Sequence, residues 1–408
     1  MATAEGTQNR LSYIRESAWG VPDVALAGAY NTIRKLAGAG VNVERSQLMT
    51  AEMNERRAVT GMRLGTYKGM ASVPFELSYC GDEKPFDDLL ESWMCRAWTD
   101  AASAIAAQTV TVGVVGATTT MLAGTSIGTI AVGDWIKVTG FATTQVGNNG
   151  YYRVSVVNTL TLTLVTPNAV AQGMIAGAST AGTVILQRMA YIHPGTTVKS
   201  LAFEEAQLDV DLYKQLKGAI ANTFSLNMTP DALVTGSFDF MGKEFDTSGT
   251  KYNSSIVAAP TNQPMTANDS LAYLMFNNAA VAVVTNMSIT ATNNLEHLFP
   301  IGSLTPYGIG KGDSGVTGTM DVYLLDTTYW TQYLAETSFT LTVRLMEQGA
   351  TAPGLGYAFD IPNCKLTSLS ESKEKTKVML SLPFTALESA TAGLYGGSTI
   401  NMRWHRLA

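Results

Sequence analysis

Val-Thr-Gly-Ser-Phe-Asp-Phe at residues 234–240 and Val-Met-Leu-Ser-Leu-Pro-Phe at residues 378–384 decide the fold, because each closes one copy of a repeated pattern. In both segments apolar residues alternate with small or polar ones, as the two faces of a β-strand require. Each segment follows another candidate strand, residues 223–228 in the first case and 365–370 in the second. The sequence therefore predicts a closing pair of strands in each of two tandem β-rich units.

Both predicted units also open in the same way. A strand is followed by a long loop, a second strand and a short helix, and these three regular elements fall at 41–45, 69–79 and 85–98 in the first unit and at 283–290, 315–324 and 327–336 in the second. In the first of these helices, Phe86, Leu89 and Trp93 recur at helical spacing and predict an amphipathic helix that covers a sheet. A tandem duplication with long loops favours assembly over chemistry.

The composition fits this fold class. Charged residues are 15% of the 408 residues and 37 residues are Gly, whereas an ordinary soluble domain is about 25% charged. Such a chain is expected to form many strands joined by small-residue turns, and a charge-poor surface is typical of one that neighbouring subunits cover. The net charge of −6 and the lack of a basic cluster argue against tight nucleic-acid binding, which needs Lys and Arg to neutralise phosphates.

Cysteines and apolar stretches give little sign of redox or membrane function. Cys80, Cys95 and Cys364 lack metal-ligand or redox spacing and are expected to be small buried hydrophobes, although a disulfide between Cys80 and Cys95 stays open. The N-terminus has no apolar core of a secretory signal. Residues 101–133 and 154–187 are uncharged or nearly so, but too polar to span a bilayer. We expect a protein made in a reducing cytoplasm with no membrane contact.

A small all-β module interrupts the first unit. Between residues 101 and 187 the charged residues are Asp134, Lys137 and Arg153, and alternating strands are predicted at 133–140, 150–157 and 159–165. Insertions are tolerated where the chain ends lie close together on a free surface. The module is therefore expected on the exterior of whatever the two units build.

These patterns divide the chain into six segments. The expected order is an N-terminal arm, the first β unit in two pieces around the inserted domain, a linker rich in Ser, Thr, Asn and Pro, the second β unit, and a C-terminal tail; the ranges are 1–40, 41–100 with 191–245, 101–190, 246–280, 281–392 and 393–408. Tyr13, Ile14 and Trp19 of the arm require burial, either on their own chain or on a neighbour. Both alternatives stay open.

Two glycine-rich matches do not support an enzyme. Gly312-Asp-Ser-Gly315 matches part of a serine-protease nucleophile segment, but Val316 stands where a Gly is expected, and none of the three histidines has the required setting. The same loop matches a dinucleotide pattern but precedes a strand instead of a helix. We predict no catalytic residue, no cofactor and no metal site.

The long loops carry the candidate contact residues. Structureless loops above about 12–15 residues are uncommon unless they bind something, and both units have one at the same place, 45–68 and 293–315. The charged residues proposed to contact another subunit are Glu52, Glu55, Arg56, Arg57, Arg63, Glu296, Lys311 and Asp313. A separate acidic run, Glu204, Glu205, Asp209 and Asp211, is either a solvated edge or a negative stripe that faces a pore.

Several of these phrases resemble tail tube (major tail) proteins of long, non-contractile-tailed bacteriophages, the siphophages. The resemblance rests on residues 11–22, on Phe-Glu-Leu-Ser-Tyr at 75–79 with Phe-Asp-Asp-Leu-Leu-Glu at 86–91, on 223–242, and on 316–323 and 379–384 in the second unit. It covers about residues 11–100 and 195–390, and leaves the inserted domain outside. It implies two tandem tail-tube β-sandwich or barrel units, each with a short α-helix.

What the resemblance implies about function is structural. Subunits of this family form stacked rings whose inner sheets join edge to edge, long loops reach the next ring, and an acidic lumen lets DNA pass into the host cell. The expected partners are further copies of the chain, the tape measure protein in the lumen, and the tail terminator and tail-tip proteins. The expected location is the virion tail, assembled in the bacterial host cytoplasm. Two β units per chain favour trimeric pseudo-sixfold rings over hexameric rings.

One alternative function belongs to a different class. The inserted domain could make the chain a surface adhesin or carbohydrate-binding protein, and an exposed aromatic patch around Trp135, Tyr151 and Tyr152 would favour that function. Packing of these rings in a core would remove its support.

Overall fold

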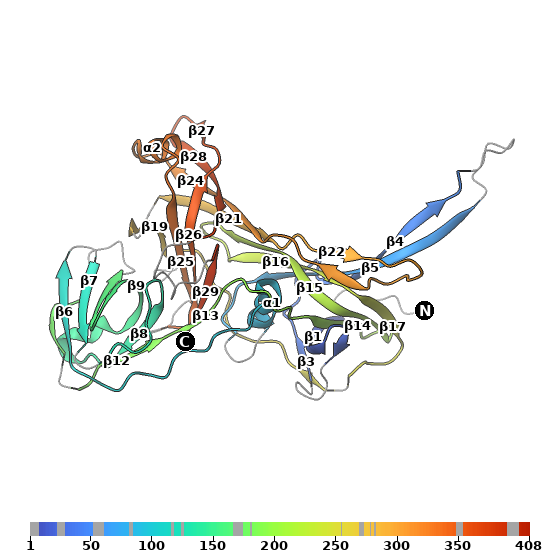
Figure 1. Ribbon diagram of the computed structural model, residues 1–408, viewed down its shortest axis with the longest axis horizontal. Coiled ribbons are helices and arrows are strands. Elements are labelled where there is room, and N and C mark those ends of the chain that lie inside the picture. Colours follow the sequence, from blue (N-terminus) through green and yellow to red (C-terminus); the bar gives the residue numbers. More distant parts are fainter. Residues whose placement is uncertain are drawn as a thin grey trace.

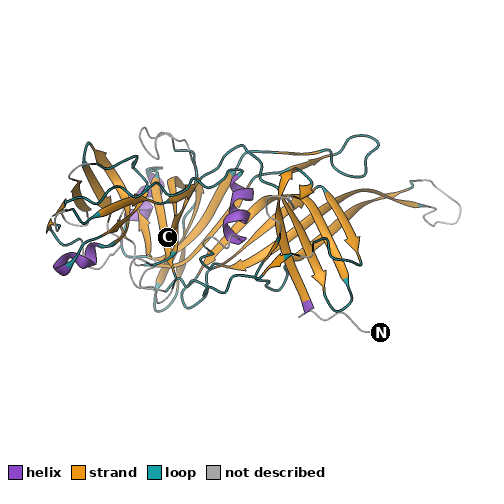
Figure 2. Cartoon of the chain, turned by 90° about the horizontal axis from the view of Figure 1, so that it is seen from below, coloured by secondary structure: helices purple, strands orange, loops and turns teal. Residues whose placement is uncertain are grey.

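The computed structural model of the chain describes residues 8–22, 29–51, 61–80, 85–115, 118–123, 126–165, 174–179, 182–253, 255–268, 273–277, 279–280, 283–347, 354–389 and 400–408. Strands dominate the described residues, which include only two α-helices (Figure 2). The predicted mainly-β class with one short helix per unit is thereby confirmed. The described strands do not close into a barrel, and each unit is instead a pair of sheets.

One long antiparallel sheet runs through both units. Its order is β4-β5-β16-β15 in the first unit followed by β21-β24-β28-β26 in the second. The same order, first strand, second strand, last strand and penultimate strand, therefore occurs twice, as the duplication predicts. The bounds are β4 Gly40–Met49, β5 Met62–Glu76, β16 Thr235–Gly242, β15 Leu212–Met228, β21 Val284–Thr292, β24 Gly315–Tyr323, β28 Val378–Ala386 and β26 Gly356–Leu366, with β27 Ser370–Lys373 continuing β26 beside β28.

Each unit has a second sheet that shares its longest strand with the long sheet. The order is β3-β1-β14-β15-β17 in the first unit and β19-β25-β26-β29-β13 in the second. The bounds are β1 Asn9–Ala18, β3 Tyr30–Thr32, β14 Leu201–Gln207, β17 Glu244–Ser248, β19 Tyr273–Phe276, β25 Phe339–Met346, β29 Arg403–Leu407 and β13 Ala190–Ile192, with the short strands β2 Val21–Pro22, β18 Ile256–Val257 and β20 Ala279–Ala280 at the margins.

The two units match down to the strand register. Leu201 pairs with Ala219 and Phe203 with Leu216 across a bulge, and in the second unit Phe339 pairs with Cys364 and Leu341 with Ile361 across the same kind of bulge. This shared irregularity lets residues of one unit be assigned to their counterparts in the other.

Strand β15 passes from one sheet to the other at Gly218. Its residues 212–219 pair with β14 and β17, and residues 220–228 pair with β16 and β21. Gly218 has φ +67°, a left-handed conformation that glycine adopts without strain. Glu16 accepts a hydrogen bond from the Gly218 N–H at 2.6 Å, and the Trp19 indole donates to the Gly218 carbonyl at 2.9 Å. Residues of β1 and the following turn thus hold the bend.

Helix α1, Pro85–Met94, lies at the centre of the core. Its Phe86 ring contacts Phe75 and Phe238 of the first unit and Tyr357 and Trp404 of the second, with ring centroids 5.0–5.9 Å apart. One apolar core therefore runs from the first unit into the second. Helix α2, Thr328–Leu334, is the counterpart at the far end of the second unit (Figure 1).

The inserted domain forms a separate sheet with its own core. The order is β11-β6-β7-β10-β9-β8-β12, and the bounds are β11 Gly177–Ala178, β6 Val110–Val115, β7 Thr118–Ala123, β10 Thr161–Val165, β9 Gly150–Asn158, β8 Trp135–Thr139 and β12 Ile185–Arg188, with a 3₁₀ turn at Thr143–Asn148. Thr99 and Tyr191 form a β-bridge where the chain enters and leaves, so the ends of the insertion are adjacent.

Three segments expected to be peripheral are instead parts of the sheets. In the segment expected to be an arm, β1 pairs with β14 and buries Leu11, Tyr13 and Ile14 completely, so this segment packs on its own chain. The expected linker supplies most of β17 and all of β18 and β19. The expected C-terminal tail supplies β29, which lies between β13 and β26. The sequences of the expected arm, linker and tail did not reveal these pairings, because backbone hydrogen bonds between distant strands leave no local pattern.

Candidate assembly surfaces

The first long loop is a projecting β-hairpin. Residues 45–68 were expected to be a polar loop, but β4 and β5 stay paired out to Met49 and Met62 and extend well beyond the body of the protein (Figure 1). Arg63 is exposed on β5. The other candidates in this loop, Glu52, Glu55, Arg56 and Arg57, lie outside the described residues.

The hairpin exposes apolar side chains. Met49 is 63% exposed and its partner Met62 54%, and Leu64, paired with Gln47, is 47% exposed. Directly opposed residues of an antiparallel pair point to the same side, so these side chains form one apolar stripe along the projecting end. Contiguous exposed apolar surface marks a contact with another protein.

The second long loop also forms a hairpin, β22 Glu296–Leu298 with β23 Gly308–Gly310. The Tyr67 N–H donates to the Leu304 carbonyl at 3.1 Å, so this hairpin lies beside β5, as Figure 1 shows. Ile301 is fully exposed and Tyr307 is 81% exposed at its tip. The structure therefore brings the two predicted loops together at one end of the long sheet.

The three candidates in the second loop are exposed but dispersed. Glu296 lies on β22, whereas Lys311 and Asp313 lie in the connection to β24. Lys311 donates from Nζ to the carbonyl of Thr196 at 2.7 Å, which ties this connection to the segment after β13.

Two of the four acids predicted for a pore lie inside the protein. Glu204 is fully buried and paired with Arg10 at 2.9 Å, and Glu205 is 6% exposed. Burial alone would raise the pKa of Glu205, but the N–H of Val41, Asn9 and two lysines lower it below its ordinary value. The prediction that Glu204 and Glu205 face a pore is therefore not supported, because these carboxylates stabilise the packing of β14. Asp209 and Asp211 are exposed in the β14–β15 turn.

The outer face of the long sheet is rich in hydroxyl groups and mildly acidic. Along β15, β16, β21, β24 and β28 every second residue is buried, and the alternate residues that face away from the core are mostly Ser, Thr, Asn and Asp. Asp239 accepts a hydrogen bond from Ser72 at 2.7 Å. The hydroxyls of Ser225 and Ser237 are hydrogen-bonded to each other at 2.9 Å. Asp321 accepts from Asn286 at 3.1 Å. This face offers polar groups without a cluster of cations.

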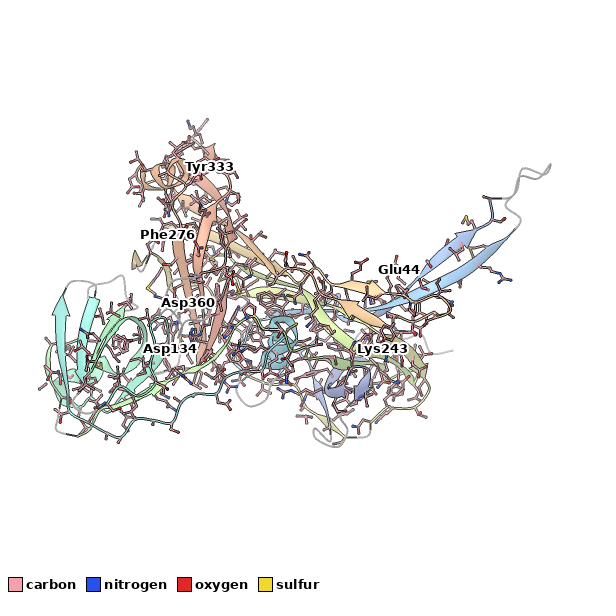
Figure 3. All side chains as sticks on the ribbon, in the orientation of Figure 1. Glu44, Asp134, Lys243, Phe276, Tyr333 and Asp360 are labelled. Atoms are coloured by element: carbon pink, nitrogen blue, oxygen red, sulfur yellow. The ribbon has the colours of Figure 1, made fainter. Side chains whose placement is uncertain are left out.

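A buried charge network joins the inserted domain to the second unit. Arg403 of β29 donates to Asp134 at 2.7 Å, and Arg153 of β9 donates to Asp360 of β26 at 2.9 Å. The indole of Trp135 also donates to Asp360 at 3.2 Å. Figure 3 places Asp134 and Asp360 at this junction. The inserted domain is thus docked firmly on its host.

The same junction buries the aromatic residues considered for glycan binding. Trp135 is 0% exposed, Tyr151 2% and Tyr152 6%. Trp135 and Tyr151 pack with Met346, Ala358 and other residues of the junction, while Tyr152 belongs to the core of the inserted domain. These residues form no exposed aromatic patch, which removes the feature that would have favoured an adhesin.

Among the described residues, no His, Cys, Asp and Glu side chains gather into a group that could hold a metal ion. Cys80, Cys95 and Cys364 are all free and buried, as expected, and the disulfide left open between the first two is not formed. Within the described part of the chain, no helix is long and apolar enough to cross a membrane.

The match to a known family decides the identity of the chain. A family model described as phage tail tube protein matches residues 6–386. The chain belongs to the phage tail tube protein family. No curated protein matches it significantly. The family is one of structural phage tail proteins and not of enzymes, so this tail tube protein is a bacteriophage virion component with a structural role in the tail.

The apolar stripe of this tail tube protein could not be recognised from the loop's composition, because charged residues are enriched in residues 45–68. The signal was present in Gln47-Leu-Met49 and Met62-Arg-Leu64. Polar and apolar residues alternate there as in strands, on both sides of the charge-rich residues 52–57. The junction of Asp134 and Arg403 left no such signal, since the two residues are far apart in the chain and meet only through the tertiary fold.

Proposed function

We propose that the tail tube protein assembles into stacked rings that form the conduit for phage DNA. The observation that carries this proposal is the join between β15 and β21, in which the penultimate strand of the first unit pairs edge to edge with the first strand of the second, from Thr223 with Thr292 to Met228 with Met287. One chain thus already contains one complete unit-to-unit contact.

The same kind of edge is free at both ends of the long sheet. Within the described residues, β4 pairs only with β5, and residues 365–373 of β26 and β27 pair only with β28. β4 is the counterpart of β21, and this part of β26 is the counterpart of β15. Pairing β26 of one chain with β4 of the next would repeat the internal join and leave no open edge in a closed ring.

The internal join also supports a ring count. One chain supplies two equivalent units, so three chains would complete a ring of six units with pseudo-sixfold symmetry. The contact between units is head-to-tail, which a two-fold symmetric dimer of chains would not continue. We therefore propose trimeric rings over hexameric ones.

A closed ring would place the outer face of the long sheet in the lumen, since the opposite face is covered by the core. The acids we propose to line it are Glu76, Asp239 and Asp321, in place of Glu204 and Glu205. Asp209 and Asp211 lie in a turn of the other sheet, away from this face. A hydroxyl-rich, mildly acidic wall would repel phosphates and let DNA slide without binding.

The projecting hairpins support contacts between rings. We propose that the stripe of Met49, Met62 and Leu64, with the charged residues of both loops, contacts the next ring. The inserted domain would lie on the exterior. The further proposed partners are the tape measure protein in the lumen and the tail terminator and tail-tip proteins, with assembly in the bacterial host cytoplasm.

Electron microscopy of the assembled protein tests the proposal. In the internal join Thr223 pairs with Thr292. With Phe240 and Phe384 as counterparts, the corresponding residues across two chains are Thr367 and Glu44. We expect tubes of constant diameter with three chains per ring, and Glu44→Cys with Thr367→Cys to give disulfide-linked trimers under oxidation. Six chains per ring would refute the trimer, and failure of the wild-type protein to form tubes would refute the function.

A further inference from the structure

The two helices of the tail tube protein are equivalent in fold but not in burial. Each ends in a left-handed residue, Cys95 with φ 49° and Glu336 with φ 51°, and in each the next N–H bonds five residues back, Arg96 to Glu91 and Thr337 to Gln332. All ten residues of α1 are buried, whereas in α2 only Tyr329 and Gln332 are. Helix α2 therefore lacks a cover that α1 has.

The cover of α1 comes from the neighbouring unit. Tyr357 of β26 lies 5.0 Å from Phe86 between ring centroids, and its hydroxyl donates to Asp87 at 2.8 Å. Arg406 of β29 donates to the same carboxylate at 2.8 Å. At the other end of α1, Asn293 donates to the Trp93 carbonyl at 2.7 Å. The second unit thus closes over the helix of the first.

The uncovered surface on the second unit exposes two large apolar side chains. Leu325 just before α2 is 70% exposed and Leu334 at its end is 74% exposed, whereas Trp93, which corresponds to Leu334, is 1% exposed. A groove beside Leu334, lined mainly by polar residues, runs between α2 and residues 365–367 at the end of β26. We call Leu325, Leu334 and this groove the α2 socket. It borders the free edge of the long sheet.

The register identifies what should fill the α2 socket. Tyr357, which pairs with Leu345, corresponds to Leu212, which pairs with Gln207. Leu212 is 37% exposed, and its neighbours in the β14–β15 turn, Leu208 and Val210, are 41% and 40% exposed. Three exposed apolar residues in one turn form a second surface without a partner. In Figure 1 this turn and α2 lie at opposite ends of the molecule, so they cannot meet within one chain.

We infer that the α2 socket binds the β14–β15 turn, Leu208 to Leu212, of a second copy of this chain. The inference rests on the proposed ring, and it adds a contact outside the shared sheet. The second copy covers α2 as the second unit covers α1, with Leu212 in the place of Tyr357. Apolar contact replaces the pairing of Tyr357 and Arg406 with Asp87, because Thr328 stands at the position of Asp87.

A pair of cysteines tests the contact directly. Phe86 corresponds to Thr327, so Leu212→Cys and Thr327→Cys should cross-link neighbouring chains in assembled tubes. The native cysteines are buried and free, which keeps the background low. The control is Leu212→Cys with Val146→Cys, since Val146 is 61% exposed but lies on the inserted domain. We expect chain-to-chain disulfides from the first pair only.

A charge in the socket gives an independent measurement. Leu334→Glu should leave the monomer folded, with an unchanged melting temperature, and should reduce the fraction of assembled protein at least tenfold, while Val146→Glu should assemble normally. Tubes that form without the first cross-link, or a Leu334→Glu protein that assembles like wild type, would overturn the inference and leave the proposed function standing. Wild-type protein that forms neither rings nor tubes would overturn both.

Discussion

Arg403 donates from Nη2 to Asp134 Oδ1 over 2.7 Å, and the two residues, which are 269 positions apart, are 1% and 2% exposed. The pair connects the last strand of the chain to the inserted domain. Because the inserted domain also contacts Asp360 through Arg153 and Trp135, its orientation on the tail tube protein is fixed by charges that cannot reach water.

Breaking this pair should be costly. Arg403→Met leaves Asp134 buried without its partner, and removing one member of a buried ion pair costs about 3–5 kcal/mol. We expect a loss of that order in the free energy of unfolding, measured by urea denaturation, and faster proteolysis between the inserted domain and its host. Lys375→Met, at an exposed position, is the matched control and should change stability little. Equal stability of the two variants would contradict the role assigned to the pair.

Acid should weaken the same junction. Burial lowers the pKa of His405 to about 4 from its ordinary 6.5, although Asp360 beside it favours the charged form. Between pH 6.5 and 4 the unfolded chain takes up a proton at this residue and the folded chain does not. The contribution of neutral His405 to the free energy of unfolding is fully present above pH 6.5. It falls as the pH drops, by up to about 1.4 kcal/mol per pH unit.

The slope of stability against pH checks this assignment. His405→Gln should reduce the slope of the free energy of unfolding against pH between pH 6.5 and 4. The reduction should correspond to about one fewer proton taken up on unfolding. Asp87, whose pKa burial raises to about 6, acts in the opposite sense, since its stability contribution falls as the pH rises from 3.8 to 6. The comparison is therefore between the slopes of wild type and variant. An unchanged slope would mean that His405 does not titrate as its burial requires.

The bend of β15 depends on a glycine. An alanine Cβ at Gly218 would lie 2.7 Å from Cβ of Lys243 and 2.8 Å from the Trp19 indole nitrogen, at φ +67°. We expect Gly218→Ala to destabilise the protein by more than about 1 kcal/mol. Gly38→Ala separates strain from crowding, because Gly38 has φ +89° with no atom near the added Cβ. If both variants lose the same stability in thermal denaturation, the contacts of Trp19 and Lys243 contribute nothing.

The apolar stripe on the hairpin should govern stacking. Met49→Lys with Met62→Lys removes two exposed methionines, and burial of one such side chain is worth roughly 1.5–3 kcal/mol. We expect a protein with unchanged melting temperature that forms rings but at least about tenfold fewer long tubes, counted by electron microscopy. Val156→Lys changes an exposed residue of the inserted domain and should stack normally. Normal stacking of the double variant would exclude the stripe from the contact between rings.

The acids on the long sheet should control DNA passage. Asp239→Lys with Asp321→Lys reverses charge on the face proposed to line the lumen, and added cations would bind phosphates through counterion release. Phage carrying this variant should eject DNA more slowly, most clearly at low salt, with tubes of normal length. Asp100→Lys, exposed at the entry to the inserted domain, is the control. Ejection at wild-type rates would place another surface in the lumen.

The sequence by itself determined the repeated unit, both helices and the separate inserted domain. Phe238 and Phe384 each belong to a segment in which apolar residues alternate, as in a strand. Phe86 and Trp93 recur at the spacing of a helix. These are local patterns, and local patterns survive in a linear sequence.

Only the tertiary structure decided which edges join and which acids are exposed. Glu204 and Asp209 belong to the same acidic run in the sequence. Glu204 is buried and paired with Arg10 and the N–H of Tyr252, whereas Asp209 is exposed. The burial of α1 likewise depends on β26 and β29, strands far away from it in the chain, and among the described residues α2 has no such cover. Such contacts follow from packing between distant segments, and no periodicity within either segment encodes them.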